Sequence, residues 1–198
     1  MPVAIVVGFA AQRTVSGVPG LALTLALVWG VMVLVWWIRG GRGWRIDEEL
    51  HVAASPEATF AILDDPARAA RLDPRVVAVE VDGPLGPGQR VRARLDVGRR
   101  EVVDESVIVD RVPPTLLVAD VRAVTVGGRP VQIGTQRQTL AFSPAPGGGT
   151  RVALRVRGRP VGFASRMRIG LVHPGEARNA RAALRRLADQ VSVPERSL

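Results

Sequence analysis

The chain contains no cysteine, no tyrosine and no lysine, and only two of its 198 residues are histidine. Without cysteine there is no disulfide, no thiolate nucleophile and no cysteine-based metal site. His51 and His173 are far apart in the sequence, so zinc and haem sites lack ligands, and we interpret both residues as structural. We therefore expect neither a metal nor a cofactor.

All 27 basic residues are arginine, and the formal net charge is +9. An excess of positive charge favours anionic partners such as lipid headgroups or nucleic acid, without choosing between them. Aromatic residues make up only 4% of the chain, which argues against recognition of single strands by base stacking. We therefore do not expect a nucleic-acid partner.

One long stretch near the N-terminus has no charged residue. Residues 19–38 read PGLALTLALVWGVMVLVWWI, and twenty helical residues cover roughly 30 Å, the thickness of a bilayer's hydrocarbon core. Trp36 and Trp37 stand where an interfacial aromatic belt is expected, and Arg39 follows at once. The sequence therefore predicts a single transmembrane helix over residues 19–38.

The arginines around this segment predict its orientation. Arg39, Arg42 and Arg45 follow the segment, against Arg13 alone before it, so the positive-inside rule places the C-terminal domain in the cytoplasm. The alternative is a cleaved signal peptide, whose apolar region would be shorter and would end at an A-x-A-like site. We expect an N-terminal tail over 1–18, a juxtamembrane linker over 39–45, a folded domain over 46–192 and a C-terminal tail over 193–198.

The folded domain is predicted to begin with a strand and two short helices. Apolar and polar side chains alternate over residues 46–52, as they do in a strand. Ser55 before Pro56 is a helix N-cap followed by proline at the first helical position, and this predicts a helix to about Leu63. Asp65 before a second proline repeats the signal and predicts a second helix to about residue 72. The acidic pair at 64–65 is therefore interpreted as helix capping.

Six strands and a long helix are predicted after these helices. Clusters of glycine and proline separate the strands at 83–88, 98–100, 113–114, 127–130 and 144–149. Strands 91–97 and 151–157 alternate clearly, each with one buried and one wet face. An apolar stripe predicts the C-terminal helix, in which Pro174 should cause a kink or a break. The stripe consists of Ala177, Ala180, Ala183, Leu184, Leu187, Ala188 and Val191.

Three segments carry a resemblance to a known superfamily. Residues 52–74, VAASPEATFAILDDPARAARLDP, resemble the opening helix pair of START-like proteins of the SRPBCC superfamily. Residues 140–156, LAFSPAPGGGTRVALRV, are similar to its penultimate hairpin, and VDRVPPTLLV at 109–118 to its proline-containing turn. The resemblance spans residues 46–192. It implies an α+β helix-grip fold, in which a curved antiparallel seven-stranded sheet wraps around the long C-terminal helix.

The same resemblance implies an apolar cavity between sheet and helix, which members of the superfamily use for lipids, polyketides or other hydrophobic ligands. We expect a membrane-tethered domain that binds a hydrophobic small molecule or lipid by burying it. The alternative is an enzyme of the polyketide cyclase/dehydratase type. The absence of tyrosine and cysteine leaves few groups for proton transfer, so we favour binding without catalysis.

The alternation of the strands predicts which residues face this cavity. If Val103, Val107 and Val109 point inward, Glu105 shares their face and is a weak candidate for a general acid or a ligand anchor. The alternatives for Glu105 are a bulge, a strand-end position or pairing with a neighbouring arginine. Gln136 and Gln138 share a face with Leu140 and could bond a ligand, unless they are exposed at the strand's open end. The expected cavity residues are Leu95, Val103, Glu105, Val107, Leu117, Val121, Gln136, Gln138, Leu140, Phe142 and Leu154.

Overall fold

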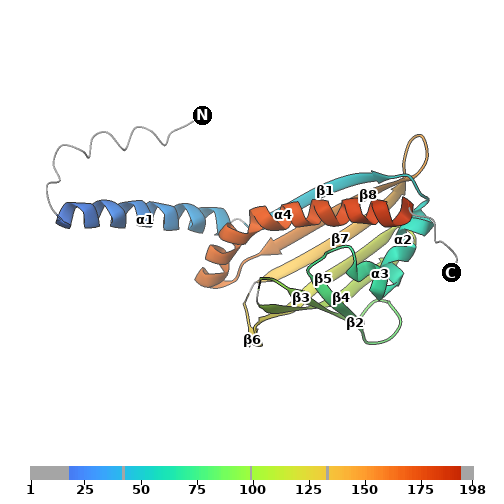
Figure 1. Cartoon of the computed structure of the whole chain (residues 1–198), viewed down its shortest axis with the longest axis horizontal. Coiled ribbons are helices and arrows are strands. Elements are labelled where there is room, and N and C mark those ends of the chain that lie inside the picture. Colours follow the sequence, from blue (N-terminus) through green and yellow to red (C-terminus); the bar gives the residue numbers. More distant parts are fainter. Residues whose placement is uncertain (1–17, 42, 99, 133, 193–198) are drawn as a thin grey trace.

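The computed structural model describes residues 18–41, 43–98, 100–132 and 134–192, with side chains in all of these except 18–23, 36–37, 39–41, 163–164 and 167–174. This part of the chain forms four helices and eight strands (Figure 1). They are α1 (Val18–Gly41), β1 (Trp44–Val52), α2 (Pro56–Asp64), α3 (Pro66–Ala70), β2 (Val76–Val81), β3 (Arg90–Asp96), β4 (Glu101–Val112), β5 (Leu116–Val126), β6 (Arg129–Pro130), β7 (Thr135–Pro144), β8 (Thr150–Arg159) and α4 (Gly162–Ser192).

The two short helices begin at the residues that the sequence predicts. The Ser55 hydroxyl accepts a hydrogen bond from the backbone N–H of Ala58, at 3.3 Å, and caps α2. The Asp65 carboxylate accepts from the N–H groups of Ala67 and Arg68 and caps α3. The second helix is shorter than predicted, because its end tightens into a turn before Pro74.

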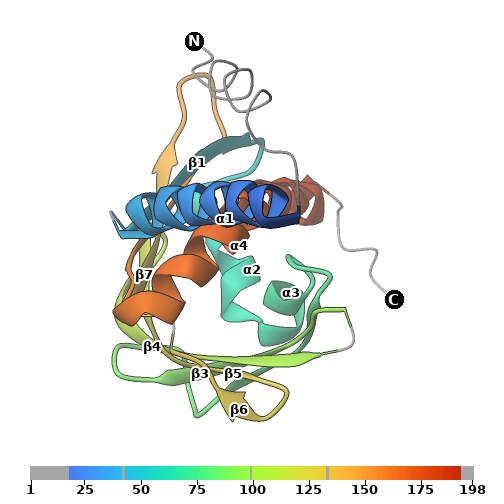
Figure 2. The same ribbon diagram turned by 90° about the vertical axis from the view of Figure 1, so that its left-hand side faces the viewer.

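The strands form one antiparallel sheet in the order β1-β8-β7-β5-β4-β3-β2, while the two-residue β6 pairs only with the end of β5. Figures 1 and 2 show this sheet curving around α4, with α2 and α3 closing one end. We call the face toward α4 the inner face and the opposite face the outer face. The seven-stranded path and the long C-terminal helix confirm the predicted α+β arrangement, and β6 is an addition within the turn predicted at 127–130.

Residues that lie directly opposite on antiparallel strands share a face, so the register defines rows across the sheet. One inner-face row crosses all seven strands and consists of Trp44, Gly158, Gln136, Val121, Ser106, Val91 and Val81. The next consists of Ile46, Val156, Gln138, Ala119 and Ile108. Inner-face positions of β8 are predicted correctly from its alternation, and those of β3 are correct up to its end at Asp96.

The hydrophobic core fills one end of the grip, where the last turns of α4 meet α2. Phe60 and Phe142 pack edge to face there, with ring centroids 5.3 Å apart. Leu184 and Leu187 from the predicted stripe are buried against them. The fully buried cluster is Val52, Phe60, Ile62, Phe142, Val152, Leu184 and Leu187. The opposite end of the grip, toward Trp44 and Gln136, lies beyond this cluster.

The C-terminal helix is assigned as one continuous element over its 31 residues. Its first turns nevertheless run in a different direction from the rest (Figure 2), as a proline within a helix predicts. On the second half of the helix, Arg181 reaches the sheet and forms two 2.8 Å hydrogen bonds with the carboxylate of Glu48 on β1. This ion pair fixes the helix to the inner face of the sheet.

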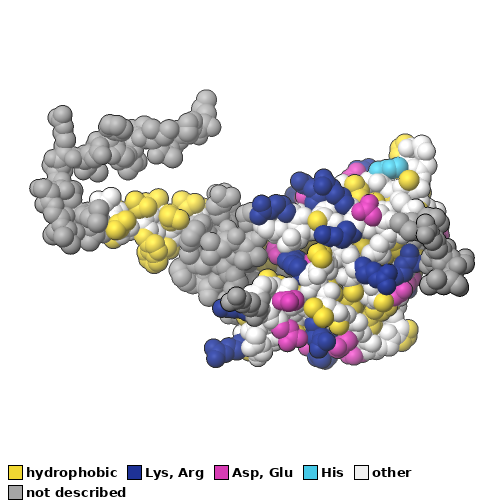
Figure 3. All heavy atoms as spheres, in the orientation of Figure 1, with side chains coloured by type: hydrophobic (Ala, Val, Ile, Leu, Met, Phe, Trp, Pro, Cys, Tyr) yellow, Lys and Arg dark blue, Asp and Glu magenta, His cyan; other side chains and the backbone are white. Residues whose placement is uncertain are grey.

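The first helix projects from the end of the domain and contacts α4 (Figures 1 and 2). Its described side chains are apolar apart from Thr24, and Leu27, Trp29 and Val31 are each more than half exposed (Figure 3). Searched over the residues that the structure describes, no helix is long and apolar enough to cross a membrane. The side chains of Trp36, Trp37 and Arg39, and residues 1–17 and 193–198, lie outside the described part.

Candidate ligand-binding site

Two amide side chains lie on the inner face beyond the core. Gln136 stands opposite Val121 and Gln138 stands opposite Ala119, and both glutamines are half-buried. Within the described part of the chain, neither side chain has a hydrogen-bond partner. A half-buried amide without a partner loses water without full compensation, so it favours a bound group with a carbonyl or hydroxyl. The prediction that these residues share the face of Leu140 is correct.

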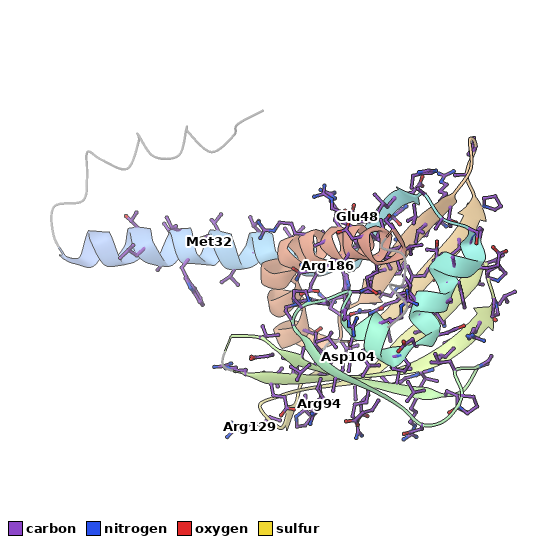
Figure 4. All side chains as sticks on the ribbon, turned by 45° about the vertical axis from the view of Figure 1, so that its right-hand side comes forward. Met32, Glu48, Arg94, Asp104, Arg129 and Arg186 are labelled. Atoms are coloured by element: carbon purple, nitrogen blue, oxygen red, sulfur yellow. The ribbon has the colours of Figure 1, made fainter. Side chains whose placement is uncertain are left out.

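A carboxyl group lies on the same face, two strands away. Asp104 is half-buried and accepts a hydrogen bond from the Ser106 hydroxyl, with 3.1 Å between the oxygens. Burial raises the pKa of Asp104 to about 6, the Ser106 hydrogen bond opposes this rise, and the negative charge of Glu176 adds to it. Figure 4 shows Asp104 on the side of the sheet that faces the helices, with Arg94 on the other side. This carboxyl group can therefore exchange a proton near neutral pH.

An ion-pair network borders Asp104 on the helix side. The guanidinium of Arg75, in the segment before β2, contacts the carboxylate of Asp73 at 2.6 Å and that of Glu176 on α4 at 3.4 Å. Partial burial opposes ionisation of Asp73, but the hydrogen bonds from Arg75 outweigh it and keep the pKa of Asp73 below its usual value. Arg75 thus pairs with Glu176, the carboxylate whose negative charge contributes to the raised pKa of Asp104.

The predicted position of Glu105 is wrong. Glu105 lies on the outer face and forms an ion pair with Arg92 at 2.7 Å, with 40% of its side chain exposed. Val103 and Val107 share that face, opposite Arg94 and Arg90 on β3. The three residues do not line the inner face, and pairing with a neighbouring arginine is the alternative that holds for Glu105.

The residue types on the inner face of β4 explain why its alternation predicts the wrong face. The register with β5 shifts between Glu105 and Ser106, where Arg122 of β5 is the extra residue, and again between Ile108 and Asp110, where Val109 of β4 is extra. Ile108 is buried and Val109 is exposed, so the inner face of β4 carries 104, 106 and 108. The sequence pattern does not predict Asp104 on the inner face, since a strand whose inner face carries Asp and Ser shows no apolar alternation there.

The remaining predicted cavity residues all lie on the inner face, but they differ in their surroundings. Phe142 belongs to the buried core, and Leu117, Leu140 and Leu154 pack against that core. Val121 is buried between Gln136 and Ser106 in the row described above, and Leu95 lies opposite Val102 on the inner face of β3. Whether these residues contact a ligand remains a prediction.

An open hollow of about 670 Å³ lies at this end of the sheet, where the chain enters β1. Gln136, Val121 and Trp44 contribute inner-face side chains to it. Trp44 lies against Gly158, which has no side chain to block the indole ring. Outer-face residues complete the lining, and they are Arg45, Asp120, Arg122, Thr135, Arg137, Arg157 and Arg159.

Other residues singled out in the sequence have structural roles. The Asp64 carboxylate accepts a hydrogen bond from Arg111 at 2.6 Å, and His51 is 2.9 Å from the carbonyl of Gly148 in the predicted hairpin turn. The side chain of His173 lies outside the described part of the chain. Among the residues that the structure describes, no group of acidic or histidine side chains is arranged to hold a metal ion.

Comparisons with known proteins agree with this architecture. A solution structure of an Arthrobacter aurescens protein covers 78% of this chain and 89% of its own, with a TM-score of 0.61 and 16% identity. A three-dimensional structure of a Rhizobium leguminosarum protein covers 75% of this chain and 94% of its own, with a TM-score of 0.59 and 16% identity. The di-domain ARO/CYC protein BexL of the BE-7585A biosynthetic pathway covers 77% of this chain and 51% of its own, with a TM-score of 0.59 and 19% identity. These likenesses show the fold alone.

Sequence comparison extends the likeness to a family. No curated protein matches the chain. Residues 43–192 match the family described as polyketide cyclase / dehydrase and lipid transport, which covers the domain predicted over residues 46–192. The chain therefore belongs to the polyketide cyclase / dehydrase and lipid transport family.

Proposed function

We propose that this chain is a membrane-attached domain that binds a hydrophobic small molecule or a lipid between the inner face of the sheet and α4. The observation that carries this proposal is the pair of half-buried amides of Gln136 and Gln138 beyond the packed core, which have no hydrogen-bond partner among the described residues. An apolar face with a few polar groups is the usual composition of a small-molecule site. Family membership supports the same class of ligand.

Burial can supply the affinity for such a ligand. Enclosing about 300 Å² of apolar ligand surface contributes roughly 7 kcal/mol at about 25 cal/mol per Å², before the entropy cost of association. Gln136 and Gln138 would then select ligands that carry a carbonyl or hydroxyl group at the matching position. The mechanism is transfer of the ligand from water or bilayer into the grip, without bond formation.

The membrane attachment rests on α1. The charge-free sequence of residues 19–38 and the exposed apolar side chains of its described part support insertion into lipid. Arg39, Arg42 and Arg45 favour the orientation with the domain in the cytoplasm. Attachment places the open end of the grip beside the bilayer, from which a hydrophobic ligand would enter.

A second candidate function is favoured by Asp104. A carboxyl group with a pKa near 6 on an apolar face is suited to general acid–base catalysis, as a cyclase or dehydratase requires. Asp104 replaces Glu105 as the residue for this role. Asp104→Asn separates the two functions, because an enzyme loses turnover and a binding protein keeps its ligand.

The direct test is mass spectrometry of small molecules that copurify with the full-length protein after extraction in detergent. We expect one hydrophobic compound with at least one oxygen function in the wild-type protein. A Gln136→Leu/Gln138→Leu variant should retain about five- to tenfold less of it, the effect of losing about 1 kcal/mol of hydrogen bonding. Gln190→Leu, on α4 where the amide donates to the carbonyl of Arg68, is the matched control. Equal recovery from all three proteins, or from none, contradicts the proposal.

A further inference from the structure

Three arginines stand side by side on the outer face, at the end of the sheet nearest α1. Arg45 lies directly opposite Arg157, and Arg157 lies directly opposite Arg137. Neighbouring strands are about 4.8 Å apart, so this row brings three guanidinium groups into a narrow space. Like charges placed directly opposite one another destabilise a sheet unless something neutralises them.

Two carboxylates neutralise this row only in part. Asp47 pairs with Arg157 at 2.8 Å and with Arg45, and Asp120 pairs with Arg137 at 2.7 Å. The hydrogen bonds from these arginines hold the pKa of both aspartates below the usual value, so both stay ionised at neutral pH. Each carboxylate is already shared, because Asp120 also contacts Arg122 at 3.5 Å.

The same arginines line the open hollow of about 670 Å³, together with Arg122 and Arg159. Among the described residues, five guanidinium groups against two carboxylates give the surroundings of this hollow a net charge of +3. Arg45, Arg122 and Arg137 expose more than half of their side chains, so their planar donors are accessible from outside. Guanidinium groups in this arrangement suit the bidentate recognition of a phosphate.

The position of the hollow indicates which phosphate it meets. Helix α1 ends at Gly41, and the lining of the hollow begins at Gly43. Two residues of extended chain span only about 7 Å, so the hollow lies at the foot of the apolar helix. We propose that this arginine hollow binds the phosphate of an anionic lipid headgroup at the surface of the membrane to which α1 attaches the domain. The inference rests on the membrane attachment proposed above and is independent of the inner-face site.

The test measures binding of a soluble lipid to the full-length protein in a neutral detergent. Dioctanoyl phosphatidylglycerol is titrated against dioctanoyl phosphatidylcholine, with inorganic phosphate as a competitor. We expect phosphatidylglycerol to bind about tenfold more tightly, since each arginine near an anionic headgroup contributes to attraction. Arg137→Gln/Arg157→Gln should reduce this preference to less than about threefold, while Arg45 and Arg122 remain to pair the two aspartates.

The control variant is Arg178→Gln/Arg185→Gln, which removes the same charge from exposed positions on α4. It should keep the preference of the wild-type protein, and an equal loss in both variants would overturn the proposal by showing a general charge effect. If Arg137→Gln/Arg157→Gln does not fold, Arg122→Gln/Arg159→Gln tests the same hollow and leaves both aspartates paired. Full displacement of the lipid by millimolar inorganic phosphate would assign the hollow to free phosphate and overturn the lipid source.

A separate readout distinguishes this site from the attachment itself. Wild-type protein in native membranes is washed with alkaline carbonate, and retention in the pellet is expected. Release into the supernatant contradicts membrane attachment, and it also contradicts the headgroup site, which depends on that attachment. Retention without a preference for phosphatidylglycerol overturns the headgroup site alone.

Discussion

The hydroxyl of Ser106 donates a hydrogen bond to the carboxylate of Asp104, two residues earlier on the inner face of β4. Because the pKa of Asp104 is raised from its ordinary 3.8 to about 6, the folded state holds the proton more tightly than the unfolded state. Stability conferred by the protonated group is therefore complete below pH 4 and is lost as the pH rises through 6. Asp104→Asn should make the protein more stable at pH 7.5, by about 2–3 kcal/mol, and should change little at pH 4.

Denaturant unfolding of the full-length protein in mild detergent, at both pH values, measures this difference. Glu105→Gln is the matched control, since it changes the adjacent carboxylate on the outer face. Its exposed ion pair with Arg92 should contribute less than about 1 kcal/mol, at either pH. If the stability difference between Asp104→Asn and wild type is the same at pH 7.5 and at pH 4, the pKa of Asp104 is not raised in the folded protein.

The ion pair between Glu48 and Arg181 should be needed for the attachment of α4 to the sheet. Glu48 is only 13% exposed on the inner face of β1, whereas Arg181 is 60% exposed. Arg181→Met would leave the largely buried Glu48 carboxylate without its cation, and we expect a loss of about 1–3 kcal/mol in unfolding free energy. Arg178→Met, one turn earlier on the exposed side of α4, should stay within about 0.5 kcal/mol of wild type. Equal losses in both variants would exclude a specific role for the pair.

Gly158 and Trp44 form a close contact that allows no side chain at the glycine. A methyl group at residue 158 would overlap the indole ring, which lies over the glycine from the opposite strand. Gly158→Ala should therefore destabilise the protein by about 1–3 kcal/mol, as overpacking does. In a background carrying Trp44→Ala the same change should cost less than about 0.5 kcal/mol. Thermal unfolding of the four proteins of this cycle gives the coupling, and additive losses would contradict the contact.

The course of the chain could be predicted from local signals, because these act over a few residues. Ser55 and Asp65 cap the helices where expected, and the alternation of β8 gives its buried face. The pattern of β4 indicates the wrong face because Asp104 and Ser106 lie on its inner face. Its register with β5 also includes one bulge on each strand, which no local window contains. Register between strands depends on both partners at once.

The site depends on the same long-range pairing. Gln136 could be assigned to the inner face because β7 has no bulge in its pairing, so its parity extends unchanged from Phe142. Asp104 could not be assigned in this way, because its raised pKa depends on burial in the folded protein and on the charge of Glu176, which lies on α4. The row of Arg45, Arg157 and Arg137 likewise depends on register, because Arg45 and Arg157 are 112 residues apart in the sequence and only strand pairing brings them together.

The last prediction concerns the attachment of α1 to a membrane. Val28 and Val31 are each more than half exposed near the middle of the helix. An arginine at the centre of an inserted helix costs about 2.5–3.5 kcal/mol, so Val28→Arg/Val31→Arg should release the protein from membranes into the carbonate supernatant. The matched control is Val77→Arg, which adds charge at an exposed apolar position on β2 and should leave the protein in the pellet. Retention of the double variant would show that the apolar surface of α1 is not what holds the protein at the membrane.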